Sequence, residues 1–399
     1  MRVTIDRLGH QGDGIAPGPV YVPRALPGEL FEGKVEGDRM SDPQIVTSSS
    51  ERVTPSCPHY DTCGGCALLH ASDSFVAEWK IGVVREALRA RDLPAPIKGI
   101  ATSPPASRRR ASLSGRRTKN GALVGFHGRR SGTITEITGC QVLAPEILAA
   151  LPVLTELTEA AASRKGELSL LVTSGPAGLD VAMAGAKASD AALLTRLAEI
   201  AGHADLARLT LDGEPVIEAR SPRQVIGGMT IVPPPGAFLQ ATSHGESALI
   251  ACVAQALGDG GPVIDLFAGC GTFAVPLSRR APVHAVEGNA EMLRAAARAG
   301  SGRVTTERRD LFRDPVEAAH LSDYAAAVID PPRAGAEAQC RELAESTLQR
   351  IAFVSCNPVT FARDAGSLIR GGYRLDWVRV IDQFRWSPHV EIAAAFSRQ

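Results

Sequence analysis

A chain of 399 residues is too long for one typical hydrophobic core, so we expect two or three domains. Its 44% hydrophobic and 22% charged residues are ordinary for a globular protein, and its 43 basic residues balance 43 acidic ones, so net charge identifies no partner. No stretch approaches the ~18–20 continuous apolar residues of a membrane helix, and no apolar segment follows the N-terminus. We therefore expect a cytoplasmic protein without a membrane span.

Short strand-like runs broken by glycine and proline begin the chain. MRVTIDRL, GHQGDGIAPG and VYVPRALPGELFEGKV combine apolar alternation with turn signals. The polar stretch SDPQIVTSSSERVTPS then ends this unit. The pattern predicts a small β-barrel over residues 1–54.

Cysteine spacing singles out the next segment. CPHYDTCGGC places Cys57, Cys63 and Cys66 in a C-x5-C-x2-C pattern, and Cys140 is the only other cysteine in this half of the chain. Four thiolates can hold a tetrahedral zinc ion or a [4Fe–4S] cluster, and clustered cysteines in a long cytosolic chain favour metal binding or catalysis over disulfides. The spacing alone leaves zinc, iron–sulfur and no metal open.

We expect an α+β central unit over residues 55–232. Apolar residues at helical spacing predict an amphipathic helix over residues 74–91, which can pack on the C-terminal unit. Between Ala101 and Arg130 there are eight basic residues and no acidic one, a pattern that suits either a phosphate backbone or a solvated face. Strand-like runs such as LSLLVTS then alternate with helical runs such as DAALLTRLAEIAG.

Short apolar strands alternate with helical stretches from residue 233 to 399. VIDLFAG, VHAVEGN, RVTTERRD, AAVIDPP and IAFVSCN are the strand-like runs. Regular alternation of this kind predicts a doubly wound α/β domain with a parallel sheet. Ligands bind such sheets at the carboxyl ends of the strands.

The segment DLFAGCGT joins the first of these strands to its helix and predicts a nucleotide-type loop. Gly269 and Gly271 permit a tight turn and close approach of a ligand. Glu287 ends the second strand, where a carboxylate can accept both hydroxyls of an adenosine ribose, and Asp310 follows the third, where an adenine can be read. NAD and S-adenosylmethionine fit equally. The loop DPPR at Asp330 favours a methyltransferase that holds a planar base, because its prolines stiffen the backbone and remove two N–H donors.

Cys356, in SCNPVTFARD at the end of the fifth strand, is either a buried thiol or a nucleophile. Asn357 is a good N-cap and Pro358 suits the first helical position, so the thiol is expected at a helix N-terminus, which lowers a thiol pKa. Methylation of a pyrimidine at C5 would use it, because thiolate addition at C6 makes C5 nucleophilic. A base must then remove the C5 proton. Glu391, in SPHVE, is the candidate base or else a surface carboxylate.

Together these motifs resemble the RNA uridine-C5 methyltransferases, which make 5-methyluridine in transfer and ribosomal RNA. SCNP, DPPR, a terminal H-x-E and FLQ before the glycine loop occur in the family's order over essentially the whole chain. The resemblance implies a class I methyltransferase fold with Cys356 as nucleophile and Glu391 as base. It also implies that the following residues line the S-adenosylmethionine and uracil site: Gln240, Phe267, Thr272, Glu287 and Asp330. Thr272 stands where the family often has asparagine, and RWSP at residues 385–388 replaces a more usual Pro-x-Thr-x.

The resemblance also bears on the N-terminal half. One branch of the family combines C-x5-C-x2-C with a distant cysteine and holds a [4Fe–4S] cluster, and KNGALVGFHGRRSGTITEITGCQVL is similar to that branch around the fourth ligand. An iron–sulfur cluster on Cys57, Cys63, Cys66 and Cys140 is implied, with a structural or RNA-positioning role. LGHQGDGIA and ALPGE resemble the TRAM domain, a small RNA-binding β-barrel.

The hypothesis from the sequence is a monomeric cytosolic enzyme that uses S-adenosylmethionine to methylate C5 of a uridine in ribosomal or transfer RNA. The alternative is a non-catalytic iron–sulfur RNA-binding protein that retains the methyltransferase fold. The intact set of Cys356, Glu391 and Asp330 favours the enzyme.

Overall fold

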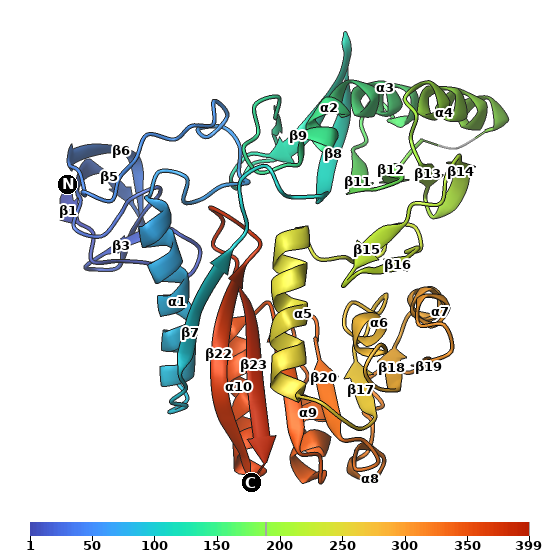
Figure 1. The fold of residues 1–399 in the computed structure, drawn as a ribbon. Helices are drawn as coiled ribbons and strands as arrows, with labels where there is room; N and C mark the ends of the chain where they lie inside the picture. Colours follow the sequence, from blue (N-terminus) through green and yellow to red (C-terminus); the bar gives the residue numbers. More distant parts are fainter. Residues whose placement is uncertain (188–189, 399) are drawn as a thin grey trace.

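The computed structural model describes residues 1–187 and 190–398 (Figure 1). Residues 188 and 189 of the expected central unit and residue 399 of the expected C-terminal unit lie outside this description. Within it the chain forms sheets of six, seven and eight strands and a two-stranded hairpin. In Figure 1 the six-stranded sheet (blue) and the seven-stranded sheet (green) lie above the eight-stranded sheet, which is yellow to red with one strand in teal.

The first sheet is built from residues 2–47 and bends back on itself. Its spatial order is β1 (Arg2–Thr4), β5 (Leu30–Glu36), β6 (Arg39–Thr47), β4 (Val20–Val22), β3 (Gly14–Ala16) and β2 (Arg7–Leu8). Strands β1 and β2 are consecutive in the chain yet lie at opposite edges. Between them Ile5 donates its N–H to the carbonyl oxygen of Glu29, just before β5, and Asp6 donates to that of Ile15 in β3. One dipeptide thus bonds beside β5 and to β3, the strands next to the two edges, and Val3, Val22 and Phe31 are buried inside.

The second sheet belongs to the α+β region. Its core joins Leu113 and Leu170 of the sheet to Leu154 and Leu197 of the covering helices. The strands are, in spatial order, β10 (Ile134–Glu136), β9 (Gly121–His127), β8 (Arg110–Thr118), β11 (Leu168–Gly175), β12 (Gly178–Ala184), β13 (Arg208–Leu211) and β14 (Glu214–Glu218). The helices are α2 (Pro145–Ala149), α3 (Leu151–Ala161) and α4 (Ala191–His203).

The eight-stranded sheet confirms the predicted α/β fold. Its spatial order is β19 (Val304–Arg308), β18 (Val283–Glu287), β17 (Val263–Leu266), β20 (Ala326–Ile329), β21 (Arg350–Ser355), β23 (Glu391–Arg398), β22 (Tyr373–Asp382) and β7 (Ile97–Thr102). The strands from β19 to β21 are parallel, and β23 is antiparallel to both of its neighbours. Strand order reverses between β17 and β20, which is the switch point where ligands bind such sheets.

Helices cover both faces of this sheet. One apolar cluster packs the sheet against α5 (Ser243–Leu257), α6 (Ala274–Leu277) and α7 (Ala290–Ala299). The other packs it against α1 (Asp73–Arg89), α8 (Ala318–Leu321), α9 (Glu337–Glu345) and α10 (Pro358–Arg370). The hairpin of β15 (Gln224–Ile226) and β16 (Met229–Ile231) packs on α7. In the described ranges no helix is both long enough and apolar enough to cross a membrane.

The segment from α1 to β7 lies on the C-terminal sheet, although the sequence assigns it to the central unit. Strand β7 pairs in parallel with β22, and Ile81, Val84 and Leu88 of α1 are buried in the core on the α10 side. The packing of the helix follows from its predicted apolar face. The strand IKGIAT gives little sequence signal, because it is an edge strand and most of its residues are only partly buried.

A buried ion pair fastens α1 to the end of β22. Lys80 is 0% exposed and its Nζ lies 2.6 Å from Asp382 Oδ1, which is 1% exposed. The ammonium also donates to the carbonyl oxygen of Phe384 at 3.1 Å, and Asp382 accepts the N–H of Phe384 at 3.0 Å. Burial lowers the pKa of Lys80, and the opposing effect of Asp382 is smaller, so the pKa is lowered overall. The pair therefore fixes the loop that follows β22.

We predict that Lys80→Met lowers the free energy of unfolding by about 3–5 kcal/mol, because Asp382 is left buried without its partner. Urea titration followed by tryptophan fluorescence measures the loss. The matched control is Lys34→Met, which removes an exposed ion pair with Glu36 and should change stability by no more than about 1 kcal/mol. Equal losses in the two variants would contradict the role of the buried pair.

Candidate active site

The carboxyl ends of β17, β18, β20 and β21 open on one cavity of about 1630 Å³. It extends past the cysteine segment to Gln11, beside β2 of the first sheet. All residues that the sequence predicts for the site line this cavity except Gln240 and Gly271. The lining members are Phe267, Gly269, Thr272, Glu287, Asp310, Asp330, Cys356, Glu391, Cys57, Cys63, Cys66 and Cys140.

The glycine loop is held to the end of β18 by Glu287. Gly269 has a φ of +55° and donates its N–H to Glu287 Oε2 at 3.1 Å. The other carboxylate oxygen accepts the N–H of Asn289 at 3.0 Å, just before α7. Two backbone donors thus fix the carboxylate, and a carboxylate has further lone pairs to offer a ligand.

Gly271 is required for packing rather than for lining the cavity. Its φ is +86°, and an added Cβ would lie 2.7 Å from Val275 and 2.9 Å from Ala296 of α7. Any side chain at this position would push the loop away from that helix. The positive φ agrees with the tight turn that the sequence predicts, whereas cofactor binding by Gly271 stays a prediction.

Two aromatic residues form a wall of the cavity beside Asp310. Phe267 has a φ of +62°, which is unusual for a residue with a side chain, and its ring centroid lies 5.4 Å from that of Phe312. Asp310 accepts the N–H of Phe312 at 3.1 Å, and the Phe312 side chain is 49% exposed. The sequence analysis missed Phe312. The only sequence signal for it is that an aromatic residue stands two positions after Asp310.

Sheet register brings Cys356 and Glu391 together. Ser355, the last residue of β21, pairs with Ile392 of β23, so Cys356 and Glu391 are the next residues in register. Residues opposite one another on antiparallel strands share a face. Asp330 follows the neighbouring strand β20 and lines the same cavity. Three adjacent strands therefore supply a thiol and two carboxyl groups at one place.

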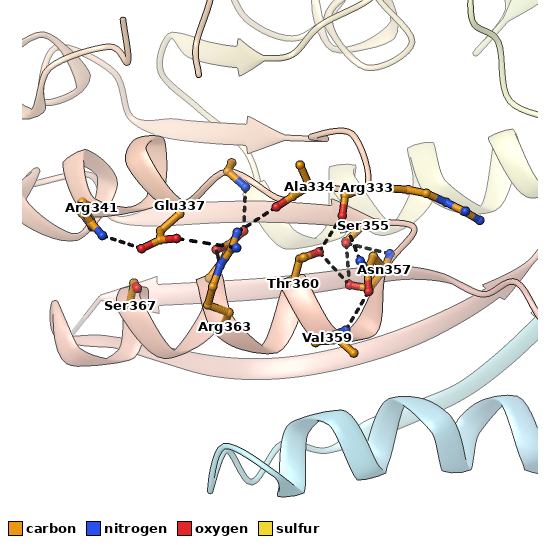
Figure 2. A network of polar contacts seen from close by, with 12 residues as sticks. Arg333, Ala334, Glu337, Arg341, Ser355, Asn357, Val359, Thr360, Arg363 and Ser367 are labelled. Carbon is orange, nitrogen blue, oxygen red and sulfur yellow. Dashed lines mark hydrogen bonds and ion pairs between the residues drawn. The ribbon is translucent and has the colours of Figure 1, made fainter. Parts of the chain in front are cut away.

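The turn that carries Cys356 is tied to the DPPR loop (Figure 2). Asn357 caps α10 by accepting the N–H of Val359 at 3.1 Å, as predicted, and Pro358 is the first helical residue. The same Asn357 side chain donates to the carbonyl oxygen of Arg333 at 2.9 Å, and Thr360 donates to that oxygen at 3.3 Å. The two loops at the ends of β20 and β21 are thus held to one another.

Burial sets the protonation of all three groups. It raises the pKa of Cys356 to about 11, with further contributions from Glu391 and Asp330. It raises the pKa of Glu391 to about 8, again with help from Asp330, and that of Asp330 to about 7. The expectation that the helix end lowers the thiol pKa is therefore wrong for the free protein. Burial and two carboxyl groups outweigh the helix end, and the thiol is protonated at neutral pH.

Arg333 and His389 form a second polar pair at the cavity. Nη2 of Arg333 lies 2.8 Å from Nδ1 of His389. Burial and then Arg333 lower the pKa of His389, so the ring is neutral and accepts this hydrogen bond. Arg333 belongs to the DPPR motif and His389 to the H-x-E motif, but the sequence analysis assigned no separate role to either residue.

Gln240 is connected to Glu391 through Gln383, a residue that the sequence analysis did not identify. Gln240 is 2% exposed, and its Oε1 accepts Nε2 of Gln383 at 2.5 Å. Nε2 of Gln383 also donates to Glu391 Oε2 at 2.9 Å. Gln383 itself is 2% exposed. Its only sequence signal is an amide after the apolar strand, in the segment that carries the H-x-E motif.

The RWSP segment, one of the two departures from the family pattern, is anchored from outside the C-terminal sheet. Nη2 of Arg385 lies 2.5 Å from Asp73 of α1, and the Trp386 indole donates to the same carboxylate at 3.0 Å. The carbonyl oxygen of Trp386 accepts the N–H of Leu68, and its ring packs with Tyr60 next to two of the predicted metal ligands. This segment thus connects the cysteine region to the strand that carries Glu391.

The four N-terminal cysteines approach one another at one end of the cavity. Burial and the other three thiols raise the pKa of Cys66 to about 12, and burial raises that of Cys63. Across residues 1–187 and 190–398 no three His, Cys, Asp or Glu side chains are arranged to hold a metal ion. The thiols are therefore neighbours without being gathered around a single ion.

The basic stretch from residue 101 to 130 does not form one face. Arg109 is buried and pairs with Glu246 of α5 at 2.6 Å. Arg129 and Arg130 reach Asp13 of the first sheet at 2.6 and 3.4 Å, which joins that sheet to the central region. Arg108 lines the cavity. Part of the predicted RNA-binding charge therefore serves the protein's own contacts.

A solved structure identifies the fold. The tRNA (uracil-54, C5)-methyltransferase of Pyrococcus abyssi, in complex with S-adenosyl-L-homocysteine, aligns with 99% of this chain and 99% of its own. The TM-score is 0.76 at 23% sequence identity. The chain therefore has the α/β methyltransferase fold.

Sequence comparison identifies the family. The family model described as tRNA (Uracil-5-)-methyltransferase matches residues 283–399. An uncharacterized RNA methyltransferase of Rhizobium meliloti is 43% identical over 99% of both chains. The 23S rRNA (uracil(1939)-C(5))-methyltransferase of Halomonas elongata is 33% identical over 98% of this chain and 88% of its own. The chain belongs to the RNA uracil-C5 methyltransferase family, as the resemblance in its motifs predicts.

The coupling between Cys356 and Glu391 predicts a pH-dependent thiol reactivity. Glu391 is a carboxylate above its pKa of about 8, so Glu391→Gln removes a negative charge from beside the thiol only at higher pH. We predict that iodoacetamide alkylates Cys356 severalfold faster in Glu391→Gln than in wild type at pH 9, and at equal rates at pH 6.5. Peptide mass spectrometry measures both rates. The control, Glu317→Gln, changes an exposed carboxylate and neither rate; equal rates for Glu391→Gln at pH 9 would contradict the coupling.

Proposed function

We propose that the protein transfers a methyl group from S-adenosylmethionine to C5 of a specific uridine in RNA, by covalent thiolate addition at C6. The observation that carries this proposal is the convergence of Cys356 and Glu391 on one cavity. Methylation at C5 of a pyrimidine needs both a nucleophile and a base on the same ring. Methylation of a ring nitrogen or a hydroxyl needs no such nucleophile, so the thiol distinguishes the reaction.

In the first step Cys356 adds to C6 of the uracil. Because the thiol pKa is raised to about 11, its proton leaves during the attack and passes to the carboxylate of Asp330, so that Glu391 stays ionised for the last step. The electrons of the C5–C6 double bond move toward O4 and form an enolate. C5 thereby becomes the nucleophile. S-adenosylmethionine, when bound, supplies the electrophilic methyl group that C5 takes.

In the last step Glu391 removes the remaining proton from C5. The electrons of the C5–H bond restore the C5–C6 double bond, the bond between C6 and sulfur breaks, and Cys356 leaves as a thiolate. The carboxyl must be ionised to act as a base, and its pKa is about 8 in the free protein. Turnover should therefore fall as the pH falls below that value.

The cofactor is proposed to lie along the glycine loop and the ends of β18 and β19. Glu287, fixed by two backbone donors, offers its free lone pairs to the ribose hydroxyls. Phe267 and Asp310 flank the space for the adenine. Thr272 is 8% exposed and lines the cavity, so its hydroxyl replaces the amide that the family often has there.

The four N-terminal cysteines are proposed to hold a [4Fe–4S] cluster. Four free thiols share one end of the cavity, and burial and the neighbouring thiols raise the pKa values of Cys63 and Cys66. A bound cation that accepts thiolates would offset this cost of ionising them. The C-x5-C-x2-C spacing with a distant fourth cysteine resembles the iron–sulfur branch of the family, and this resemblance supports the cluster over zinc. The ligands would be Cys57, Cys63, Cys66 and Cys140. The role proposed for the cluster is to fix the segment that packs on Trp386.

RNA is proposed to enter from the first sheet, which we assign as a TRAM-like RNA-binding barrel. The cavity runs from Gln11 beside this sheet to Cys356, and Arg108, Arg130 and Arg333 line it, which suits a phosphate backbone. The target uridine must leave its stack, at a cost of a few kcal/mol that a loop substrate reduces. Ribosomal and transfer RNA both suit such a path. Mass spectrometry of both from a deletion strain, searching for the lost 5-methyluridine, identifies the target.

The covalent step is tested with RNA that carries 5-fluorouridine. Fluorine at C5 cannot be removed as a proton, so we predict a stable protein–RNA adduct in wild type in the presence of S-adenosylmethionine. Cys356→Ala should form no adduct and lose turnover by at least about 10³-fold. Denaturing gel electrophoresis measures the adduct. Cys252→Ala, which changes a buried cysteine of α5, is the control and should trap as wild type does; trapping by Cys356→Ala would refute the nucleophile.

The cluster is tested by metal content. Protein purified without oxygen should be brown, absorb near ~400 nm and contain about four irons per chain. Cys66→Ser should lose colour and most of the iron, whereas the control Cys252→Ser should keep both. A colourless wild type with stoichiometric zinc would contradict the cluster while leaving the methylation proposal intact.

A further inference from the structure

Gln383 is buried between Gln240 of the FLQ motif and Glu391 of the H-x-E motif. It comes directly after β22 and is 2% exposed. Its Oε1 accepts the N–H of Ala241 at 2.9 Å. Its Nε2 donates to Gln240 Oε1 at 2.5 Å and to Glu391 Oε2 at 2.9 Å. All the hydrogen-bonding capacity of the Nε2 group is therefore directed at the site.

The orientation of this amide is fixed by its partners. A backbone N–H can only donate, so the end of Gln383 that faces Ala241 must be the oxygen. The NH2 group then faces Gln240 and Glu391, and turning the amide over would place an oxygen against each of their acceptors. Gln383 is consequently a hydrogen-bond donor to Glu391 in either protonation state of that carboxyl.

The backbone on both sides of Gln383 is anchored as well. Asp382 precedes it and is held by Lys80 at 2.6 Å, and the carbonyl oxygen of Phe384, which follows it, accepts from the same ammonium at 3.1 Å. Asp382 also accepts the N–H of Phe384. The ion pair that fastens α1 to the sheet thus holds the residue that contacts the base.

The other groups that face Glu391 do not perform the same task. Asp330 disfavours its ionisation, since both would be negative, whereas the Cys356 thiol is neutral in the pH range where Glu391 ionises. Arg333 favours the carboxylate by charge, but its guanidinium donates to His389, which is neutral. Among the described residues only Gln383 donates a side-chain hydrogen bond to Glu391. Oε1 of Glu391 accepts none there, which leaves it for the proton of C5.

We propose that Gln383 is a positioning residue that holds Glu391 ready as a proton acceptor and couples it to Gln240. The inference rests on the proposed function, because it concerns the step in which the C5 proton leaves. A donor on Oε2 stabilises the carboxylate against its burial and directs Oε1 at the substrate. It also binds Gln240 by its oxygen, which connects Glu391 to this buried amide.

Gln383→Met tests the inference, because methionine has a similar length and no hydrogen-bond donor. Without its donor the carboxylate of Glu391 is less stable, so its pKa rises and less of the base is ionised at neutral pH. We expect the acidic limb of the turnover profile to move up by about one to two pH units. At pH 7 a covalent complex between the variant and ordinary RNA, already methylated, should accumulate, and turnover should recover as the pH rises. Gel electrophoresis with labelled methyl groups measures the complex.

Gln339→Met is the matched control. Gln339 is 0% exposed and bonds the backbone of Val316 through both ends of its amide, away from the cavity. It reproduces the loss of a buried amide, so it should lower stability and leave the pH profile unmoved. If Gln383→Met lowers turnover equally at every pH and accumulates no complex, its role is structural and the inference is wrong.

Gln383→Glu keeps the test decisive if the methionine variant does not fold. Glutamate has nearly the same volume and retains an oxygen for Ala241, but it places a second carboxyl against Glu391. The two carboxyls would share a proton, which couples their ionisation, so the acidic limb should move away from its wild-type position. An unmoved limb would overturn the inference. If wild type itself forms no Cys356-dependent adduct with 5-fluorouridine RNA, the proposed function has failed instead.

Discussion

The pairing of β23 with β21 is the constraint on which the site depends. This last strand inserts antiparallel into a parallel sheet, with Ser355 opposite Ile392. The chain therefore delivers Glu391 at the point where Cys356 leaves the sheet. Because side chains alternate along a strand, a slip of one residue would turn Glu391 to the opposite face. Buried residues such as Phe396, packed against Phe353, hold the register.

The same burial that fixes this register raises the pKa values of the groups it brings together. The Cys356 thiol, with a pKa of about 11, and Glu391, with a pKa of about 8, are therefore mostly uncharged at neutral pH before substrate binds. A protonated thiol reacts slowly with stray electrophiles, and under the proposed mechanism its proton leaves when a uracil accepts the electrons. Gln383 and Arg333 favour the ionised form of Glu391, which burial disfavours.

The sequence predicted the parts of the fold that have a repeating signal. Parallel strands buried on both faces are apolar runs, so the α/β unit could be recognised, and the chemistry of C5 methylation paired Cys356 with Glu391. Strand β7 was not predicted because an edge strand needs few apolar residues. Lys80 and Gln383 were missed because a single buried polar residue does not belong to any periodic sequence pattern. The thiol pKa was mispredicted because a helix end can be read from neighbouring residues, whereas the burial that raises the pKa depends on the whole fold.

Release of the C5 proton tests the central claim most directly. RNA that carries tritium at C5 of uridine should lose one tritium to water for each methyl group that wild type transfers. Glu391→Gln should retain the tritium in a methylated covalent complex bound through Cys356. Methyl transfer by wild type without release of tritium would mean that another atom is methylated, and would contradict the account of Cys356 and Glu391 given above.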